Sequence, residues 1–107
     1  MQNNFESIVN VGSRTYLNAN DIVMMVAEIN YTTLFLSNGK KLLVSYHLGK
    51  LHERLVNYPS FIRPNRNTII NTNHLEDFGI DSLKINGHFI KVSRRRKDAI
   101  QDSLRIA

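Results

Sequence analysis

The sequence contains no cysteine and no tryptophan. Because there is no cysteine, the 107-residue chain cannot form a disulfide framework or a thiolate metal site, and it suits a reducing compartment. No apolar run approaches the roughly 18 residues that a membrane-spanning helix needs. The start, MQNNFESIVN, also lacks the basic and apolar regions of a signal peptide. We therefore expect a cytoplasmic protein.

The common catalytic motifs are missing as well. The sequence has neither type of glycine-rich phosphate loop and no Gly-x-Ser-x-Gly nucleophile elbow. His47 and His52 are five residues apart on an expected helix, so they face different directions and make a poor metal pair. His74, Glu76 and Asp77 fall at an expected strand-to-turn junction, which accounts for them without catalysis. We therefore expect neither an enzyme nor a cofactor.

Charge is unevenly distributed along the chain. The net charge is +5, with a pI near 9.8. Residues 1–53 carry four basic and four acidic side chains, whereas residues 54–107 carry ten basic and five acidic ones. The second half therefore holds the whole excess. A basic half on a balanced scaffold favours a polyanionic partner, most often nucleic acid.

Short strands separated by turn signals dominate the pattern. Hydrophobic residues make up 42% of the chain, enough for one folded domain over residues 1–107. The segment DIVMMVAEI predicts a buried strand. Three residue pairs that each separate two apolar segments predict hairpins: Gly12-Ser13, Asn38-Gly39 and Asn86-Gly87. Regular turn signals of this kind indicate about eight to ten short strands.

Two helices are expected. One follows Ser45 as N-cap, carries leucines at helical spacing and ends before Pro59. The other spans residues 94–105, with Ser93 as N-cap. Between the two helices, a polar loop is expected to lead into the short strand Thr68–Asn71. About forty residues separate the helices, so the helix-turn-helix motif is absent. Any DNA recognition must then use strands and loops.

The expected last helix begins with four cations: Arg94, Arg95, Arg96 and Lys97. A helix N-terminus already carries about half a positive charge, and acidic residues are preferred there. Exposed cations can turn away from the helix axis at little cost, in which case they form a solvated face. The alternative is an anion, because a helix N-terminus flanked by arginine is a ready phosphate site.

Basic and amide-rich residues fall in three segments: EINYTT (28–33), RPNRN (63–67) and SRRRK (93–97). Arg66 lies between Asn65 and Asn67 in a loop stiffened by Pro64. Arginine can pair with both O6 and N7 of guanine, and asparagine can pair with adenine or donate to phosphate. Asparagines in loops also cap backbone groups, which we expect of Asn67.

The order of these segments resembles the LytTR family, the DNA-binding output domain of bacterial response regulators, from about Ile8 to Ile106. The matching stretches are MVAEINY (25–31), FIRPNRNTIIN (61–71) and VSRR (92–95). Four residues that border the expected reading loop depart from the family pattern: Pro64, Asn65, Asn67 and Thr68.

The resemblance implies a mainly β fold of about ten short strands in small, mostly antiparallel sheets with one or two short helices. It also implies that loops enter the major groove of DNA and that Arg63, Asn71 and Asn30 hold the reading loop in place. The candidates for base reading are Arg66, Arg94, Tyr31 and Thr32. The candidates for phosphate contact are Asn65, Asn67, His88, Arg95, Arg96 and Lys97.

The implied function is sequence-specific binding of double-stranded DNA in bacterial transcription regulation. The family tends to bind direct repeats, so a second copy on adjacent DNA is an expected partner, and a receiver domain often precedes this module. An alternative is a single-stranded nucleic-acid-binding β-barrel, which needs exposed aromatic rings for stacking. The chain has four tyrosines and five phenylalanines, most of the latter in apolar strand patterns. A third candidate, a metal-dependent nuclease, would be detected by a cleavage assay with magnesium or manganese.

Overall fold

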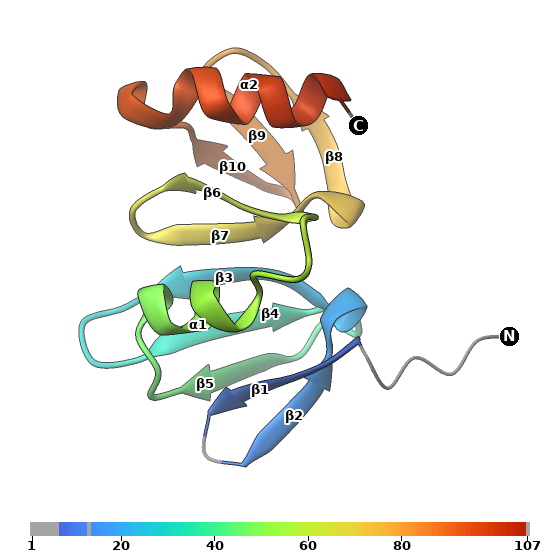
Figure 1. Ribbon diagram of the computed structural model, residues 1–107, viewed down its shortest axis with the longest axis vertical. Helices are drawn as coiled ribbons and strands as arrows, with labels where there is room; N and C mark the ends of the chain where they lie inside the picture. Colours follow the sequence, from blue (N-terminus) through green and yellow to red (C-terminus); the bar gives the residue numbers. More distant parts are fainter. Residues whose placement is uncertain (1–6, 13, 107) are drawn as a thin grey trace, which may run out of the picture.

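The structure is a computed structural model that describes residues 7–12 and 14–106 (Figure 1). Over these residues the chain forms ten strands and two α-helices, joined partly by 3-10 turns. The strands are β1 (Ile8–Gly12), β2 (Thr15–Asn18), β3 (Ile22–Ala27), β4 (Thr32–Leu36), β5 (Lys41–Val44), β6 (Phe61–Asn65), β7 (Thr68–Asn71), β8 (Leu75–Phe78), β9 (Ser82–Ile85) and β10 (His88–Lys91). The helices are α1 (Leu48–Arg54) and α2 (Lys97–Ile106), and the 3-10 turns are η2 (Ala19–Asp21), η3 (Thr72–His74) and η4 (Arg94–Arg96).

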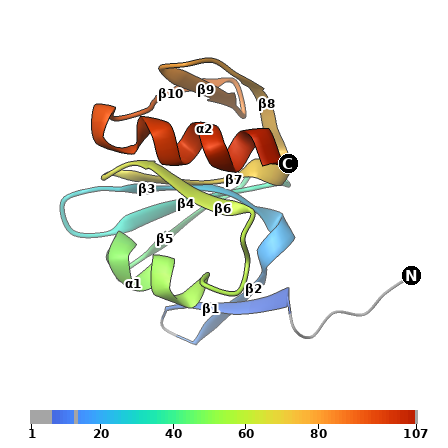
Figure 2. The same ribbon diagram turned by 45° about the horizontal axis from the view of Figure 1, so that its top comes forward.

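The strands form three antiparallel sheets. The largest has the order β5-β4-β3-β7-β6, and the smaller ones have the orders β1-β2 and β10-β9-β8. The five-stranded sheet lies between the two smaller sheets (Figures 1 and 2). This arrangement confirms the expected mainly β fold with about ten short strands in small antiparallel sheets. Among the described residues, neither helix has the length and apolarity needed to cross a membrane.

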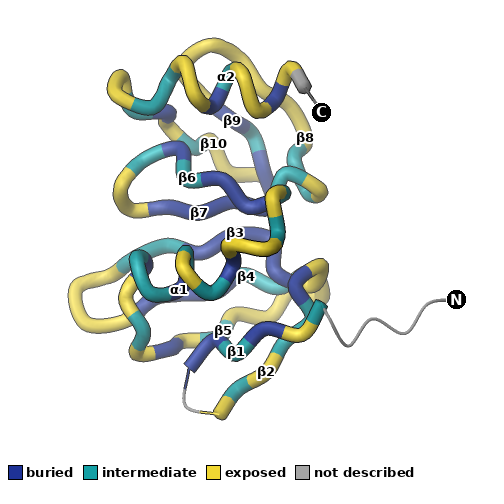
Figure 3. The backbone as a smooth tube through the Cα atoms, viewed as in Figure 1, coloured by how far each residue is buried: buried dark blue, intermediate teal, exposed yellow. Residues whose placement is uncertain are grey.

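Two hydrophobic clusters form the core, one on each face of the five-stranded sheet. Successive side chains of a strand point to opposite faces, and β3 is apolar on both. Met25 and Ile69 belong to the cluster that includes leucines of α1, whereas Met24 and Ile70 belong to the cluster that includes Ile100 of α2. Burial is accordingly concentrated along β3 and β7 (Figure 3). A strand covered on both faces reads as a continuous apolar run, which explains residues 22–27 of the segment DIVMMVAEI. The predicted strand is too long at its end, because β3 stops at Ala27 and Ile29 is 97% exposed.

The predicted hairpins are present. Asn86 and Gly87 have φ angles of 52° and 76°, and they form the two-residue turn between β9 and β10. Positive φ at both positions is what a type I′ turn requires, and glycine and asparagine tolerate it best. Asn38-Gly39 joins the paired strands β4 and β5, and β1 pairs with β2. Ser13, part of the predicted turn between β1 and β2, lies outside the described residues.

The first helix begins later than the sequence predicts. α1 starts at Leu48, and its N-cap is His47, whose Nδ1 accepts a hydrogen bond from the Lys50 amide at 3.3 Å. The predicted cap, Ser45, lies upstream in the bend that follows β5. An imidazole nitrogen can replace the usual hydroxyl because it also offers a lone pair to a free amide of the first turn.

The second helix also begins later, which changes the setting of the four cations. α2 starts at Lys97, and Arg94–Arg96 form η4 instead of the first α-helical turn. Ser93 occupies the N-cap position of η4, but its side chain makes no capping hydrogen bond. Its amide instead donates to the Pro64 oxygen at 2.9 Å, which ties this segment to β6. Tertiary contact thus overrides the local capping signal.

The residues before β7 form a strand where a polar loop was expected. Phe61–Asn65 form β6, an edge strand that pairs with β7 and has an irregular register between Ile62 and Asn65. Pro64 lies within this irregularity, and proline, which has no amide hydrogen, is tolerated at edges and bulges. The loop is therefore reduced to the turn Arg66-Asn67.

Candidate nucleic-acid interface

Three connections that are distant in sequence meet at one edge of the molecule, on the left in Figures 1 and 2. They are the β3–β4 loop, the β6–β7 turn and η4. The Ala27 amide donates to the Asn67 oxygen at 2.8 Å and joins the first to the second. The hydrogen bond from the Ser93 amide to the Pro64 oxygen joins η4 to the strand that precedes the β6–β7 turn. The structure thus brings together the three segments that stand out in the sequence.

A cleft of about 600 Å³ separates the β6–β7 turn from η4, and we call it the basic cleft. Its lining residues are Asn65, Arg66, Asn67, Thr68, Lys91, Ser93, Arg94, Arg95 and Arg96. Among these described residues every charged side chain is cationic, and six of the ten candidates from the sequence are present. Five cations around one concave surface create a positive potential that attracts a polyanion.

Arg66 lies at the exposed tip of the β6–β7 turn. Arg63 Nη2 donates to the backbone oxygen of Arg66 at 2.7 Å, so Arg63 braces the turn as the resemblance implies. Asn71 has a different role. It is fully buried at the other end of β7, where its Nδ2 donates to the Ile22 oxygen at 3.0 Å. Asn71 therefore fixes the start of β3 and not the Arg66 turn.

Asn65, which lines the basic cleft, makes hydrogen bonds to two backbone segments. Its Nδ2 donates to the Lys91 oxygen at 2.8 Å, and its Oδ1 accepts from the Asn67 amide at 2.9 Å. The capping asparagine of this turn is thus Asn65, whereas the sequence suggested Asn67. Lys91 is 26 residues from Asn65, so no local pattern in the sequence could indicate this contact.

The two candidates in the β3–β4 region differ in exposure. Tyr31 is 42% exposed, and its backbone oxygen accepts from the Glu28 amide at 2.8 Å, which closes the loop. Thr32 is 1% exposed and donates its hydroxyl to the Tyr46 oxygen at 2.8 Å. A side chain buried and bonded in this way does not face the outside of the molecule in this conformation.

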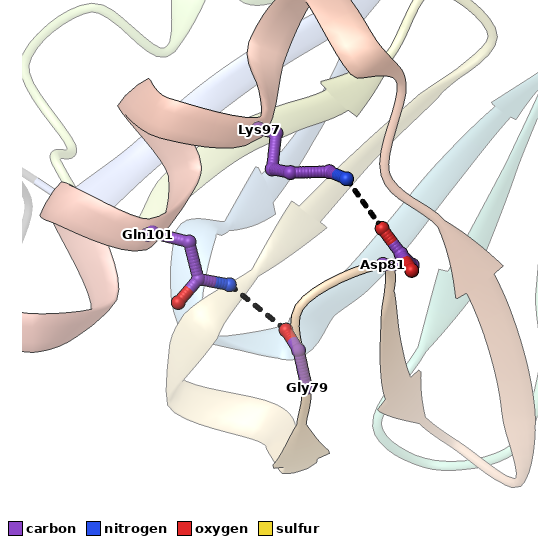
Figure 4. A network of polar contacts seen from close by, with 4 residues as sticks. All are labelled: Gly79, Asp81, Lys97 and Gln101. Carbon is purple, nitrogen blue, oxygen red and sulfur yellow. Dashed lines mark hydrogen bonds and ion pairs between the residues drawn. The ribbon is translucent and has the colours of Figure 1, made fainter.

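Lys97 does not line the basic cleft, and its side chain reaches toward Asp81 (Figure 4). Its Nζ lies 2.6 Å from Asp81 Oδ1, and one turn later Gln101 Nε2 donates to the Gly79 oxygen at 2.8 Å. The hydrogen bond and charge of Lys97 hold the pKa of Asp81 below its ordinary value. Lys97 therefore fastens α2 to the turn between β8 and β9, a contact that the sequence did not reveal.

The remaining cations of this run differ in exposure. Arg94 and Arg95 are exposed, whereas Arg96 is half-buried. Because η4 precedes the α-helix and Lys97 is paired with Asp81, the four charges are not confined to one helical turn. The conflict with the helix dipole is weaker than the sequence suggested, since the dipole acts mainly within the first turn.

His88 lies outside the residues that line the basic cleft. It is exposed at the start of β10, and its ring meets the Phe35 ring edge-on with 5.8 Å between the centroids. His74, Glu76 and Asp77 have structural partners. His74 Nε2 lies 2.7 Å from the Asn20 oxygen, and the two carboxylates accept from backbone amides. Over residues 7–12 and 14–106, no three His, Asp or Glu side chains are placed to share a metal ion.

Comparison with known proteins identifies the family and the fold. The family model described as LytTr DNA-binding domain matches residues 12–105. A solved structure, the LytTr DNA-binding domain of a Bacillus cereus protein described as a response regulator, superposes with a TM-score of 0.72. It is 19% identical and covers 91% of this chain and 94% of its own, which shows a shared fold. A comparison with curated proteins finds no significant match.

Proposed function

The chain belongs to the LytTR family of DNA-binding domains and binds DNA in transcription regulation, and we propose that it reads a specific duplex sequence from the basic cleft. One observation carries this proposal. Two braced turns, Arg66-Asn67 and η4, border a concave surface whose charged lining is entirely cationic among the described residues. Such turns can enter a major groove, which is about 12 Å wide, without a recognition helix.

The proposed roles follow from exposure and existing bonds. Arg66, Arg94 and Tyr31 read bases, because they are exposed at the edges of the three converging connections. Phosphate contacts come from four other polar or cationic side chains of the basic cleft and from the exposed His88 outside it. These residues are Asn67, Lys91, Arg95, Arg96 and His88. Thr32, Asn65 and Lys97 support these groups through the hydrogen bonds and ion pair described above.

The test of duplex reading is a competition experiment at one salt concentration. Labelled duplexes selected from a random pool compete with unlabelled duplex or single strand of the same sequence. Preference for the duplex supports the proposal, and preference for the single strand favours the β-barrel alternative. One observation favours that alternative: Phe78 and Phe89 are 47% and 75% exposed and could stack bases. They lie on β8 and β10, however, outside the lining of the basic cleft.

We also propose that two copies bind adjacent direct repeats and that a receiver domain regulates them. One domain with a radius of gyration of 13.3 Å covers only a short stretch of duplex, so a second copy would extend the footprint. Half-sites whose centres are about 10.5 base pairs apart lie on the same face of the duplex. Inserting about five base pairs between them rotates one half-site to the opposite face. Cooperative binding should then disappear. It should return when the insertion is about 10.5 base pairs, one whole turn of the duplex.

A further inference from the structure

A second cluster of basic side chains lies beside the basic cleft. His52 of α1, Arg63 of β6 and Arg96 of η4 line a cleft of about 380 Å³, together with the apolar Phe61 and other residues of β6 and α2. We call these three residues the inner cluster. They come from three elements and span positions 52 to 96, so no sequence motif indicates them. No acidic side chain is among the described residues that line this cleft.

The inner cluster contains two arginines, and no acidic side chain among the described residues that line its cleft balances their charge. Within the described part of the chain, Arg63 Nε and Arg96 Nη1 are buried and have no hydrogen-bond acceptor. Buried donors of charged groups are normally paired, because they lose their hydration without a replacement. Burial, followed by the charge of Arg96, lowers the pKa of Arg63. Burial, followed by the charges of Arg63 and Arg96, lowers the pKa of His52.

The position of the inner cluster suggests what completes it. Arg96 lines both this cleft and the basic cleft, so an anion held there would be continuous with a ligand of the basic cleft. Arg63 also donates to the oxygen of Arg66, the proposed base reader. A phosphate group offers several acceptor oxygens and full negative charge, which suits two guanidinium groups and an imidazole.

We propose that a backbone phosphate of the bound duplex, next to the groove read by Arg66 and Arg94, binds at His52, Arg63 and Arg96 and that its binding protonates His52. This proposal rests on the proposed function and adds a contact and a proton to it. The phosphate supplies the acceptor that the buried guanidinium donors lack. Its negative charge also offsets one of the two arginine charges that act on the imidazole, so DNA binding becomes linked to pH.

The sign of the linkage follows from the surroundings of His52. In the free protein the charges facing it are Arg63 from β6 and Arg96 from η4, and both favour the neutral imidazole. Its helix neighbour Glu53 is exposed and lines the adjoining cleft on the side of α1. A bound phosphate favours the imidazolium and raises the pKa of His52. Affinity for duplex should therefore increase as pH falls, by up to about tenfold per pH unit for one proton.

The experiment follows the four histidine side chains of the full chain by NMR between about pH 5.5 and 8, with and without a saturating duplex. We expect the pKa of His52 to rise when the duplex binds, and His74, which contacts the Asn20 oxygen and lines neither cleft, serves as the reference side chain. Affinity measured at constant ionic strength should show the same linkage. His52→Gln should remove the His52 part of this pH dependence, and His74→Gln should retain it.

The outcomes separate the two proposals. If the duplex binds and shifts the resonances of the Arg66 turn but leaves the His52 titration unchanged, the inner cluster does not hold a phosphate and the proposed function stands. If His52→Gln retains the full pH dependence, the proton is taken up elsewhere and the inference is overturned. If the chain binds no duplex at all, both proposals fail together.

Discussion

Arg63 donates from Nη2 to the backbone oxygen of Arg66 at 2.7 Å, so one arginine holds the turn from which the other projects. Two arginines three residues apart therefore have separable functions. The first acts through the position of the turn and is half-buried, whereas the second is exposed and free to reach a base edge. This relationship provides a matched pair of variants.

Arg66→Ala should weaken binding to the preferred duplex by about 1–3 kcal/mol and relax the choice at one base pair, because a bidentate contact with guanine is lost. Non-specific binding should change much less. The measurement is a competition assay against duplexes that carry single base-pair changes. If every duplex is weakened equally, Arg66 is a phosphate anchor, and Arg94 becomes the first candidate for base reading.

Arg63→Ala is the matched control. It removes the hydrogen bond to the Arg66 oxygen, so thermal unfolding should show a loss of stability of about 1 kcal/mol. Binding should weaken for all duplexes alike, since the turn is less well held and the inner cluster loses a cation. A change of base preference in this variant, with unchanged stability, would contradict the bracing role.

The salt dependence of binding should reflect the cations of the basic cleft. If three to five of them contact phosphates, log K should fall with log salt with a slope of roughly −3 to −5. Arg95→Ala should reduce that slope by about one. Lys97→Ala should leave the slope unchanged, because Lys97 is paired with Asp81 and does not line the basic cleft. A binding constant that is independent of salt would contradict the assignment of all these contacts.

Lys97→Ala should instead lower stability. The ion pair with Asp81 is lost, and with it one attachment of α2 to the β8–β9 turn. The pKa of Asp81 is depressed by Lys97, so this contribution is present above the ordinary aspartate pKa of 3.8 and is lost as pH falls through the depressed value. Thermal unfolding of Lys97→Ala and Asp81→Asn, singly and combined, should give changes that are less than additive at neutral pH.

Stability of the free protein should also depend on His52. Burial and two arginines depress its pKa below the ordinary 6.5, so the unfolded chain binds the proton more readily. Stability is therefore full above pH 6.5 and decreases as pH falls from that value through the depressed pKa. In His52→Gln the decrease should be smaller than in the unmodified chain. Melting temperatures at about pH 7.5 and 5.5 test this without DNA, and His74→Gln serves as control.

The sequence predicted features that depend on neighbouring residues. The turn at Asn86-Gly87, the doubly buried strand around Met24 and the family motifs all follow from local patterns. Contacts between distant segments could not be predicted in this way. The bond from Asn65 to the Lys91 oxygen joins residues 26 apart, and it is part of what brings β6 beside η4. The late start of α2 has the same origin, because tertiary contact decides where that segment becomes helical.

Tyr31 and Thr32 are adjacent in sequence and opposite in exposure, so their variants should change different properties. Tyr31→Ala removes an exposed side chain, so stability should be unchanged while affinity for the preferred duplex falls by about 0.5–1.5 kcal/mol, the range for one hydrogen bond. Thr32→Val removes the hydroxyl that donates to the Tyr46 oxygen and keeps the shape, so stability should fall by about 0.5–1.5 kcal/mol because the part-buried Tyr46 oxygen loses this hydrogen bond. Its base preference should be unchanged. If instead Thr32→Val alters base preference at full stability, β4 must open on DNA to expose this residue.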